Sequence, residues 1–143
     1  MNTPGYLRQM QLKYPDVSAQ ILFAGKAKKR GQKVHNLLCA VGHVRTQDEV
    51  FAFGDSDIRP SSLWLRYLID PLQDESVGIS TGFRWYLSQR GNFASLLRSV
   101  WNAGSASLMK DTDCYFAWGG AMAIQRELFQ ICKIKDRWKN ALS

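Results

Sequence analysis

Short apolar runs and helical stripes alternate along the chain. Four apolar runs bounded by turn residues are typical of buried strands: residues 19–24, 49–54, 77–81 and 121–124. Apolar residues at steps of three and four predict helices elsewhere: residues 4–14, 32–41, 60–69, 93–108 and 126–132. Strands that alternate with helices predict an α/β fold with a largely parallel sheet. In such a sheet ligands bind beyond the carboxyl ends of the strands.

The helix at 93–108 carries the longest apolar stripe. Asn92 can cap its first turn, and Phe93, Leu97 and Trp101 share one face with other apolar residues up to Leu108. We expect this face to pack in the core, and a helix on a membrane surface is the alternative.

Composition and length restrict the class of protein. With 143 residues, 45% of them apolar and 22% charged, the chain has the size and balance of a single globular domain, so we expect one domain over residues 1–143. No stretch approaches the ~20 apolar residues that span a bilayer, and no apolar signal core follows Met1. The three cysteines show neither a disulfide framework nor zinc-ligand spacing. We therefore expect a chain without a transmembrane segment, in the cytoplasm or at the cytoplasmic face of a membrane.

The chain is basic, and part of its positive charge is concentrated in one segment. Nineteen basic and twelve acidic residues give a net charge of +7. No acidic residue lies between Asp16 and Asp48, whereas that interval holds six cations: Lys26, Lys28, Lys29, Arg30, Lys33 and Arg45. Such a segment can bind nucleic acid, anionic lipid or a phosphorylated small molecule, or remain a solvated loop, and charge alone does not choose among them.

Two carboxylates follow the predicted strand 49–54. Asp55 and Asp57, two residues apart on a turn, can both approach one divalent cation, and hard oxygen ligands suit Mg²⁺ or Mn²⁺. Substrate phosphates often complete the coordination of such an ion, which then stabilises a departing phosphate. The alternative is that Asp55 caps a turn and Asp57 is solvated.

Other segments have residue types suited to ligand binding. Lys33 lies at the start of a predicted helix, where a phosphate can bind, or it is a solvated lysine beside a structural Asn36. Gly119 and Gly120 allow a ligand to approach the backbone, or form a bend. Arg84 and Trp85 belong to an aromatic and basic segment that can stack on a sugar or base, rest on a lipid surface, or cover a core.

The motifs, taken in order, resemble those of one family. GQKVHNL at 31–37 is followed by FAFGDSDIRP, PLQDESVGISTGFRW, WNAGSAS and FAWGGAMAIQRELF. This order is similar to that of the inverting GT-A glycosyltransferases of the ceramide glucosyltransferase-like group (families 2 and 21), especially its bacterial members. The resemblance covers nearly the whole chain. It implies part of a GT-A fold with a mainly parallel mixed sheet, a UDP-sugar donor, a divalent metal, a lipid acceptor and no nucleic-acid partner.

The resemblance also implies roles for individual residues. Asp55 and Asp57 match the DxD motif that holds the metal and the donor diphosphate, and Lys33 matches a lysine near the donor. Gly119 and Gly120 match the floor of the sugar site. Residues expected near the sugar or the acceptor are Arg84, Trp85 and Trp118.

Other expectations concern what the family has and this sequence lacks. Family members carry two strands before the position of Met1, with an acidic residue near the nucleotide base, and an acidic pair with the catalytic base beyond residues 138–143. Their transmembrane and interfacial helices are missing as well. The sequence thus corresponds to the middle of such an enzyme, and we assign no catalytic base. We expect no sugar transfer by this chain alone, and self-association through an uncovered sheet edge.

A different class of function remains open on the sequence alone. A non-catalytic α/β domain can bind nucleic acid or anionic lipid through the basic segment from Lys26 to Lys33. Binding to a phosphate backbone falls steeply with salt, whereas metal-dependent donor binding is abolished by a chelator.

Overall fold

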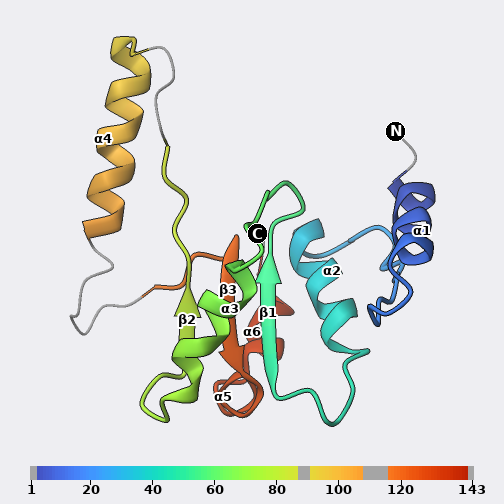
Figure 1. The fold of residues 1–143 in the computed structure, drawn as a ribbon. Helices are drawn as coiled ribbons and strands as arrows, with labels where there is room; N and C mark the ends of the chain where they lie inside the picture. The colour runs from blue at the N-terminus through green and yellow to red at the C-terminus, as the bar shows by residue number, and fades with distance from the viewer. Residues whose placement is uncertain (1–2, 87–90, 108–115, 142–143) are drawn as a thin grey trace. The chain divides into compact units, whose positions relative to one another are not determined.

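The chain forms two compact units. The computed structural model describes residues 3–86, 91–107 and 116–141. Residues 1–46 and 133–143 form one unit, here called the helical unit, and residues 47–132 form the other, the sheet unit (Figure 1).

In its described part, the helical unit consists of α1 (Thr3–Lys13), α2 (Gln32–Val41) and α6 (Ile134–Trp138). Helices α2 and α6 are in contact. Val34 on α2 is the buried residue among those described in this unit. The α2 bounds match the predicted helix, because its apolar residues recur on one face.

The predicted strand at 19–24 is wrong. These residues form no regular element, and Phe23 is 68% exposed. A strand needs a hydrogen-bonded neighbour, and the described part of the helical unit contains no strand to supply one.

The sheet unit has three described strands: β1 (Val50–Gly54), β2 (Ile79–Thr81) and β3 (Ala121–Gln125). Their order is β1-β3-β2, and both pairs are antiparallel, with Phe51 and Ile79 each opposite Ile124. The expected largely parallel sheet is therefore wrong for these strands. A parallel pair requires a crossover that packs back onto the sheet, but the helix between β2 and β3 leaves its apolar side exposed.

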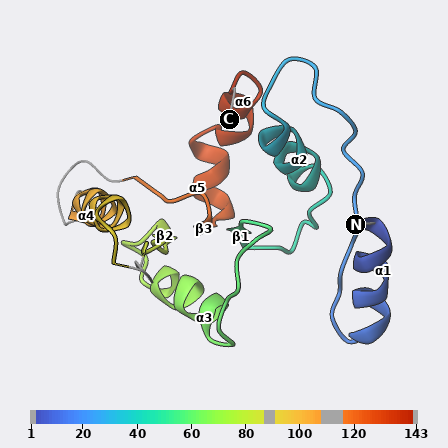
Figure 2. The same ribbon diagram turned by 90° about the horizontal axis from the view of Figure 1, so that it is seen from above.

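Helices cover both faces of this sheet. Figure 2 shows α3 (Trp64–Ile69) on one side and α5 (Arg126–Ile131) on the other. Leu68 of α3 and Leu72 of the following 3-10 helix η1 (Asp70–Gln73) pack on Ala123. On the other face Phe129 meets Phe51 edge to face, with ring centroids 5.1 Å apart. Because successive side chains of a strand point to opposite faces, the sheet contributes to two small cores, one on each face.

Helix α4 (Phe93–Ser107) begins as predicted, but it does not pack as predicted. The Ser95 amide donates to Asn92 Oδ1 at 2.9 Å, which confirms Asn92 as the cap. The expectation of a core stripe is wrong, because Phe93 is 81% and Trp101 80% exposed; Leu108 lies outside the described residues. Of the helices described, none is long and apolar enough to cross a membrane.

Candidate functional site

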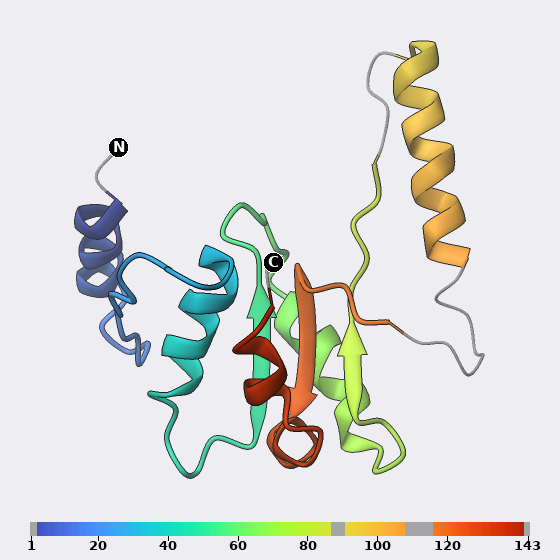
Figure 3. The same ribbon diagram turned by 180° about the vertical axis from the view of Figure 1, so that it is seen from behind.

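Three strand ends meet at one edge of the sheet. Strands β1 and β2 run in the same direction on either side of β3, so their carboxyl ends lie beside the start of β3 (Figures 1 and 3). Backbone hydrogen bonds continue past the strands: the Asp55 amide donates to Gly120 O at 3.0 Å and the Gly82 amide to Ala121 O at 2.8 Å. The turn after β1, the segment after β2 and the glycines before β3 therefore share this edge.

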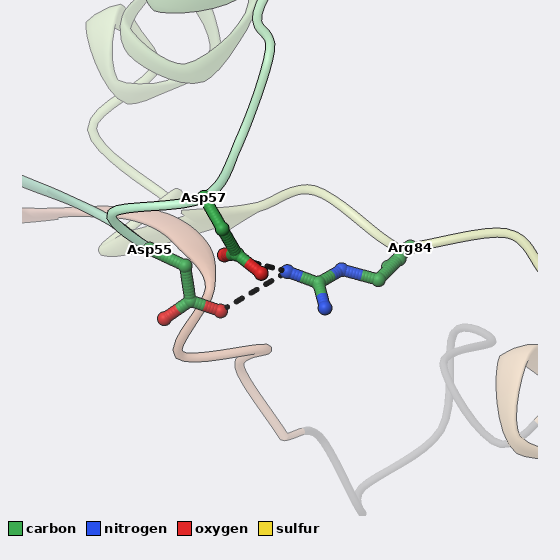
Figure 4. Close-up of polar contacts among 3 residues, drawn as sticks. All are labelled: Asp55, Asp57 and Arg84. Carbon is green, nitrogen blue, oxygen red and sulfur yellow. Dashed lines mark hydrogen bonds and ion pairs between the residues drawn. The ribbon is translucent and has the colours of Figure 1, made fainter. Parts of the chain in front are cut away.

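Asp55 and Asp57 converge on one cationic nitrogen. Nη2 of Arg84 lies 3.3 Å from Asp55 Oδ2 and 3.5 Å from Asp57 Oδ1 (Figure 4). The Asp55 side chain is 24% exposed and that of Asp57 74%. Both carboxylates therefore face a point that a positive charge already occupies, and that point is open to solvent on the Asp57 side.

Gly120 and Gly119 differ in their surroundings, although the sequence suggested one role for both. A Cβ on Gly120 would lie 2.6 Å from Asp55 Oδ2 and 2.8 Å from Trp118 Nε1, both too close for a real side chain. A Cβ on Gly119 would meet nothing within 4 Å. The absence of a side chain at Gly120 thus lets Asp55 and Trp118 approach the backbone, whereas Gly119 has open space.

Aromatic side chains surround the same edge. The Phe83 ring contacts the rings of Trp85 and Trp118 edge to face, with ring centroids 5.2 Å and 5.4 Å apart respectively. The Trp118 amide donates to Thr81 Oγ1 at 2.8 Å, which ties the segment before β3 to the end of β2. Trp118 is half-buried, whereas Trp85 is 59% exposed.

A pocket of about 470 Å³ lies beside the carboxylates. Asp57, Arg84, Trp118 and Gly120 line it, so four residues predicted from the sequence meet there. Trp85 and Gly119 are not among its lining residues. Its size and mixed lining suit a small polar ligand with a ring.

Other residues that line the pocket were not among the predicted site residues, and they include Arg59 and Trp64. Arg59 lies within the motif FAFGDSDIRP, two residues after Asp57, so its place in the motif was the available signal. Trp64 begins α3, and its ring lies 3.3 Å from the position of a Cβ on Gly54. Nothing local to Trp64 indicated that it would reach the strand end.

Lys33 belongs to the helical unit rather than to the unit with the carboxylates. It lies in the first turn of α2. The basic loop before it is closed by Gln32, which accepts from the Ala27 amide at 2.9 Å and donates to Gly25 O at 2.8 Å.

The two carboxylates fit a divalent cation that takes part of its coordination from a ligand. Among the residues that the structure describes, no three His, Cys, Asp or Glu side chains gather around one point. The oxygens of Asp55 and Asp57 can therefore provide only part of a coordination shell. Mg²⁺ and Mn²⁺ are commonly bound by one or two carboxylates together with water and phosphate oxygens.

Comparison with known families identifies the class of protein. The family model of glycosyl transferase family 21 matches residues 6–132. The chain belongs to this family, and the strand-end residues described above all lie in the matched range. The match gives no support to the alternative of a basic binding domain. Neither the curated proteins nor the solved structures include a match to this chain.

Proposed function

We propose that the sheet unit binds a nucleotide-sugar donor together with Mg²⁺ or Mn²⁺, as part of a GT-A domain for inverting glycosyl transfer to a lipid. One observation carries the proposal: Asp55 and Asp57 converge on a single cationic point beside a pocket. Membership of glycosyl transferase family 21 supports sugar transfer as the reaction class, and a UDP-sugar is the donor we favour.

Under this proposal each strand-end residue has a distinct task. Asp55 and Asp57 hold the cation, which when bound stabilises negative charge on the leaving diphosphate. Gly120, which has no side chain, leaves room for the Asp55 carboxylate beside the backbone. The Trp118 ring packs against the sugar. Transfer also requires a base that deprotonates the acceptor hydroxyl, and we assign none among the described residues.

Arg84 occupies the position that the cation would take. A guanidinium and a divalent cation cannot share the point between Asp55 and Asp57, so binding of the ion displaces Arg84 from these contacts. A displaced Arg84 remains at the pocket, where it can pair with a phosphate through two parallel hydrogen bonds. Arg84 therefore opposes binding of the cation alone and favours binding of cation and diphosphate together.

The two glycines offer a matched test by calorimetry with UDP and Mn²⁺. We expect UDP binding to need Mn²⁺, and Gly120→Ala to weaken it about tenfold or more, because the new Cβ displaces Asp55. Gly119→Ala is the control and should bind as the wild type does. Equal UDP binding with and without chelator, in folded protein, would contradict the proposal.

Arg84→Ala separates a metal site from a simple ion pair. Mn²⁺ alone should bind this variant up to about fivefold more tightly, because an exposed ion pair that competes with the ion is worth about 0.2–1 kcal/mol. UDP with Mn²⁺ should bind it more weakly. If both affinities fall together, Arg84 has no competing role and only orders the two carboxylates.

A further inference from the structure

Helix α4 presents its polar side to Tyr86, in the segment that follows β2. Ser99 Oγ donates to Tyr86 O at 2.7 Å, and the Tyr86 amide donates to Asn102 Oδ1 at 2.9 Å. Asn102 is 4% exposed. The Arg98 guanidinium lies 4.1 Å from the centre of the Tyr86 ring. These contacts set the rotation of the helix about its own axis.

The opposite side of α4 is apolar and exposed. The exposed large side chains of this side, here called the α4 stripe, are Phe93, Leu96, Leu97, Val100 and Trp101. At 100° per residue Phe93, Leu97 and Trp101 lie within one arc, and Ser95, Ser99 and Asn102 lie opposite them. The helix is thus inverted relative to an ordinary surface helix, which buries its apolar face and exposes its polar one.

The sequence on either side of α4 carries charge of one sign. The sequence contains no acidic residue between Glu75 and Asp111, and this interval holds four cations: Arg84, Arg90, Arg98 and Lys110. Such a segment complements an anionic surface. It does not complement a second copy of itself, because pairing two copies of this segment would bring like-charged stretches of sequence together.

We propose that the α4 stripe docks on the surface of an anionic lipid bilayer, with α4 in the plane of the interface. Helices of this kind bury an apolar face that contains Trp, Phe and Leu at the boundary between headgroups and acyl chains, and their cations meet anionic lipids. Trp101 and Phe93 suit that boundary. The inference goes beyond the proposed function, since docking needs neither a divalent cation nor a nucleotide.

Vesicle flotation with the whole chain tests this proposal, in chelator and without nucleotide. We expect binding to vesicles of phosphatidylcholine mixed with phosphatidylglycerol, and weaker binding to phosphatidylcholine alone or at high salt. The double variant Val100→Ser with Trp101→Ser should lower partitioning about tenfold or more, because each large apolar side chain that leaves the bilayer loses that order of affinity. Tyr67→Ser, on the exposed side of α3, is the matched control and should bind as the wild type does.

Three results would overturn the proposal. The first is no binding to either vesicle. The second is equal binding by wild type and double variant, with circular dichroism showing both folded; the substituted side chains are exposed, so folding should persist. The third is a dimer in sedimentation velocity that the double variant dissociates while vesicles fail to compete, which would assign the stripe to a second copy.

Discussion

The two units differ in how their described residues are held in place. Among its described residues, the sheet unit contains six buried apolar side chains on both faces of a hydrogen-bonded sheet: Phe51, Leu68, Leu72, Ala123, Ile124 and Phe129. In the described part of the helical unit Val34 is the buried apolar residue, and the loop before α2 is closed by polar contacts. The carboxylates therefore lie on a scaffold with its own core, whereas Lys33 follows a loop held by hydrogen bonds.

The largest effect that we expect from this difference is at Ile124. Ile124 lies on the central strand and is 0% exposed. Ile124→Ala should lower the free energy of unfolding by about 2–5 kcal/mol, because the shortened side chain leaves a cavity that the neighbouring residues cannot fill. Urea unfolding followed by tryptophan fluorescence measures this. Ile131→Ala, on an exposed side chain of the same unit, should stay within about 0.5 kcal/mol of the wild type. Equal losses would mean that the sheet faces do not form the core.

Val34→Ala tests the other side of the comparison. The loss should be about 1.5 kcal/mol, since it removes two buried methyl groups. Hydrogen exchange should show the change in α2 and leave the amides of β1 and β3 protected as before. Faster exchange throughout β3 would show that the two units unfold as one, and the comparison would fail.

A smaller effect is expected at Gln32. Its side chain bonds to the Ala27 amide and to Gly25 O, so Gln32→Ala should cost about 0.5–1.5 kcal/mol locally. The Ala27 amide should exchange faster, while the unfolding midpoint of the sheet unit stays unchanged. Asn36→Ala, one turn later, breaks only the 2.8 Å bond from Gln32 Nε2 to Asn36 Oδ1 and serves as the control. An Ala27 amide unaffected by Gln32→Ala would exclude this side chain as the closure of the loop.

The smallest effects concern one carboxyl group in each unit. Hydrogen bonds from the Ser76 hydroxyl and amide lower the pKa of Asp74, and the hydrogen bond and charge of Lys139 lower the pKa of Asp136. Because both pKa values lie below that of the unfolded chain, the stabilisation is present above the ordinary aspartate pKa and is lost as pH falls through the lowered one. In NMR titrations, Ser76→Ala should raise the pKa of Asp74 and Lys139→Met that of Asp136. Added salt should raise mainly the pKa of Asp136, because its partner Lys139 is charged. Equal salt-induced shifts at Asp74 and Asp136 would contradict this difference between the two carboxyl groups.

Local pattern was sufficient for several elements. The bounds of α2, the Asn92 cap and the position of the DxD motif directly after a strand follow from residues close together in the sequence. The family resemblance, rather than local pattern, implied that Asp57, Arg84 and Gly120 lie near one ligand. In the structure they lie at one edge of the sheet because β1 and β2 run in the same direction, with β3 between them in the opposite one. Their carboxyl ends therefore still share an edge.

The sequence by itself determined which residues alternate, which share a helix face and which follow a strand. Only the tertiary structure decided that 19–24 has no strand partner, that β3 is antiparallel, and that Gly120 rather than Gly119 contacts Asp55. The apolar side of α4 was likewise readable as a stripe, but its outward direction depends on the hydrogen bonds from Tyr86 to Asn102 and from Ser99 to Tyr86. Periodicity defines the faces of an element, whereas the direction in which each face points depends on partners distant in the sequence.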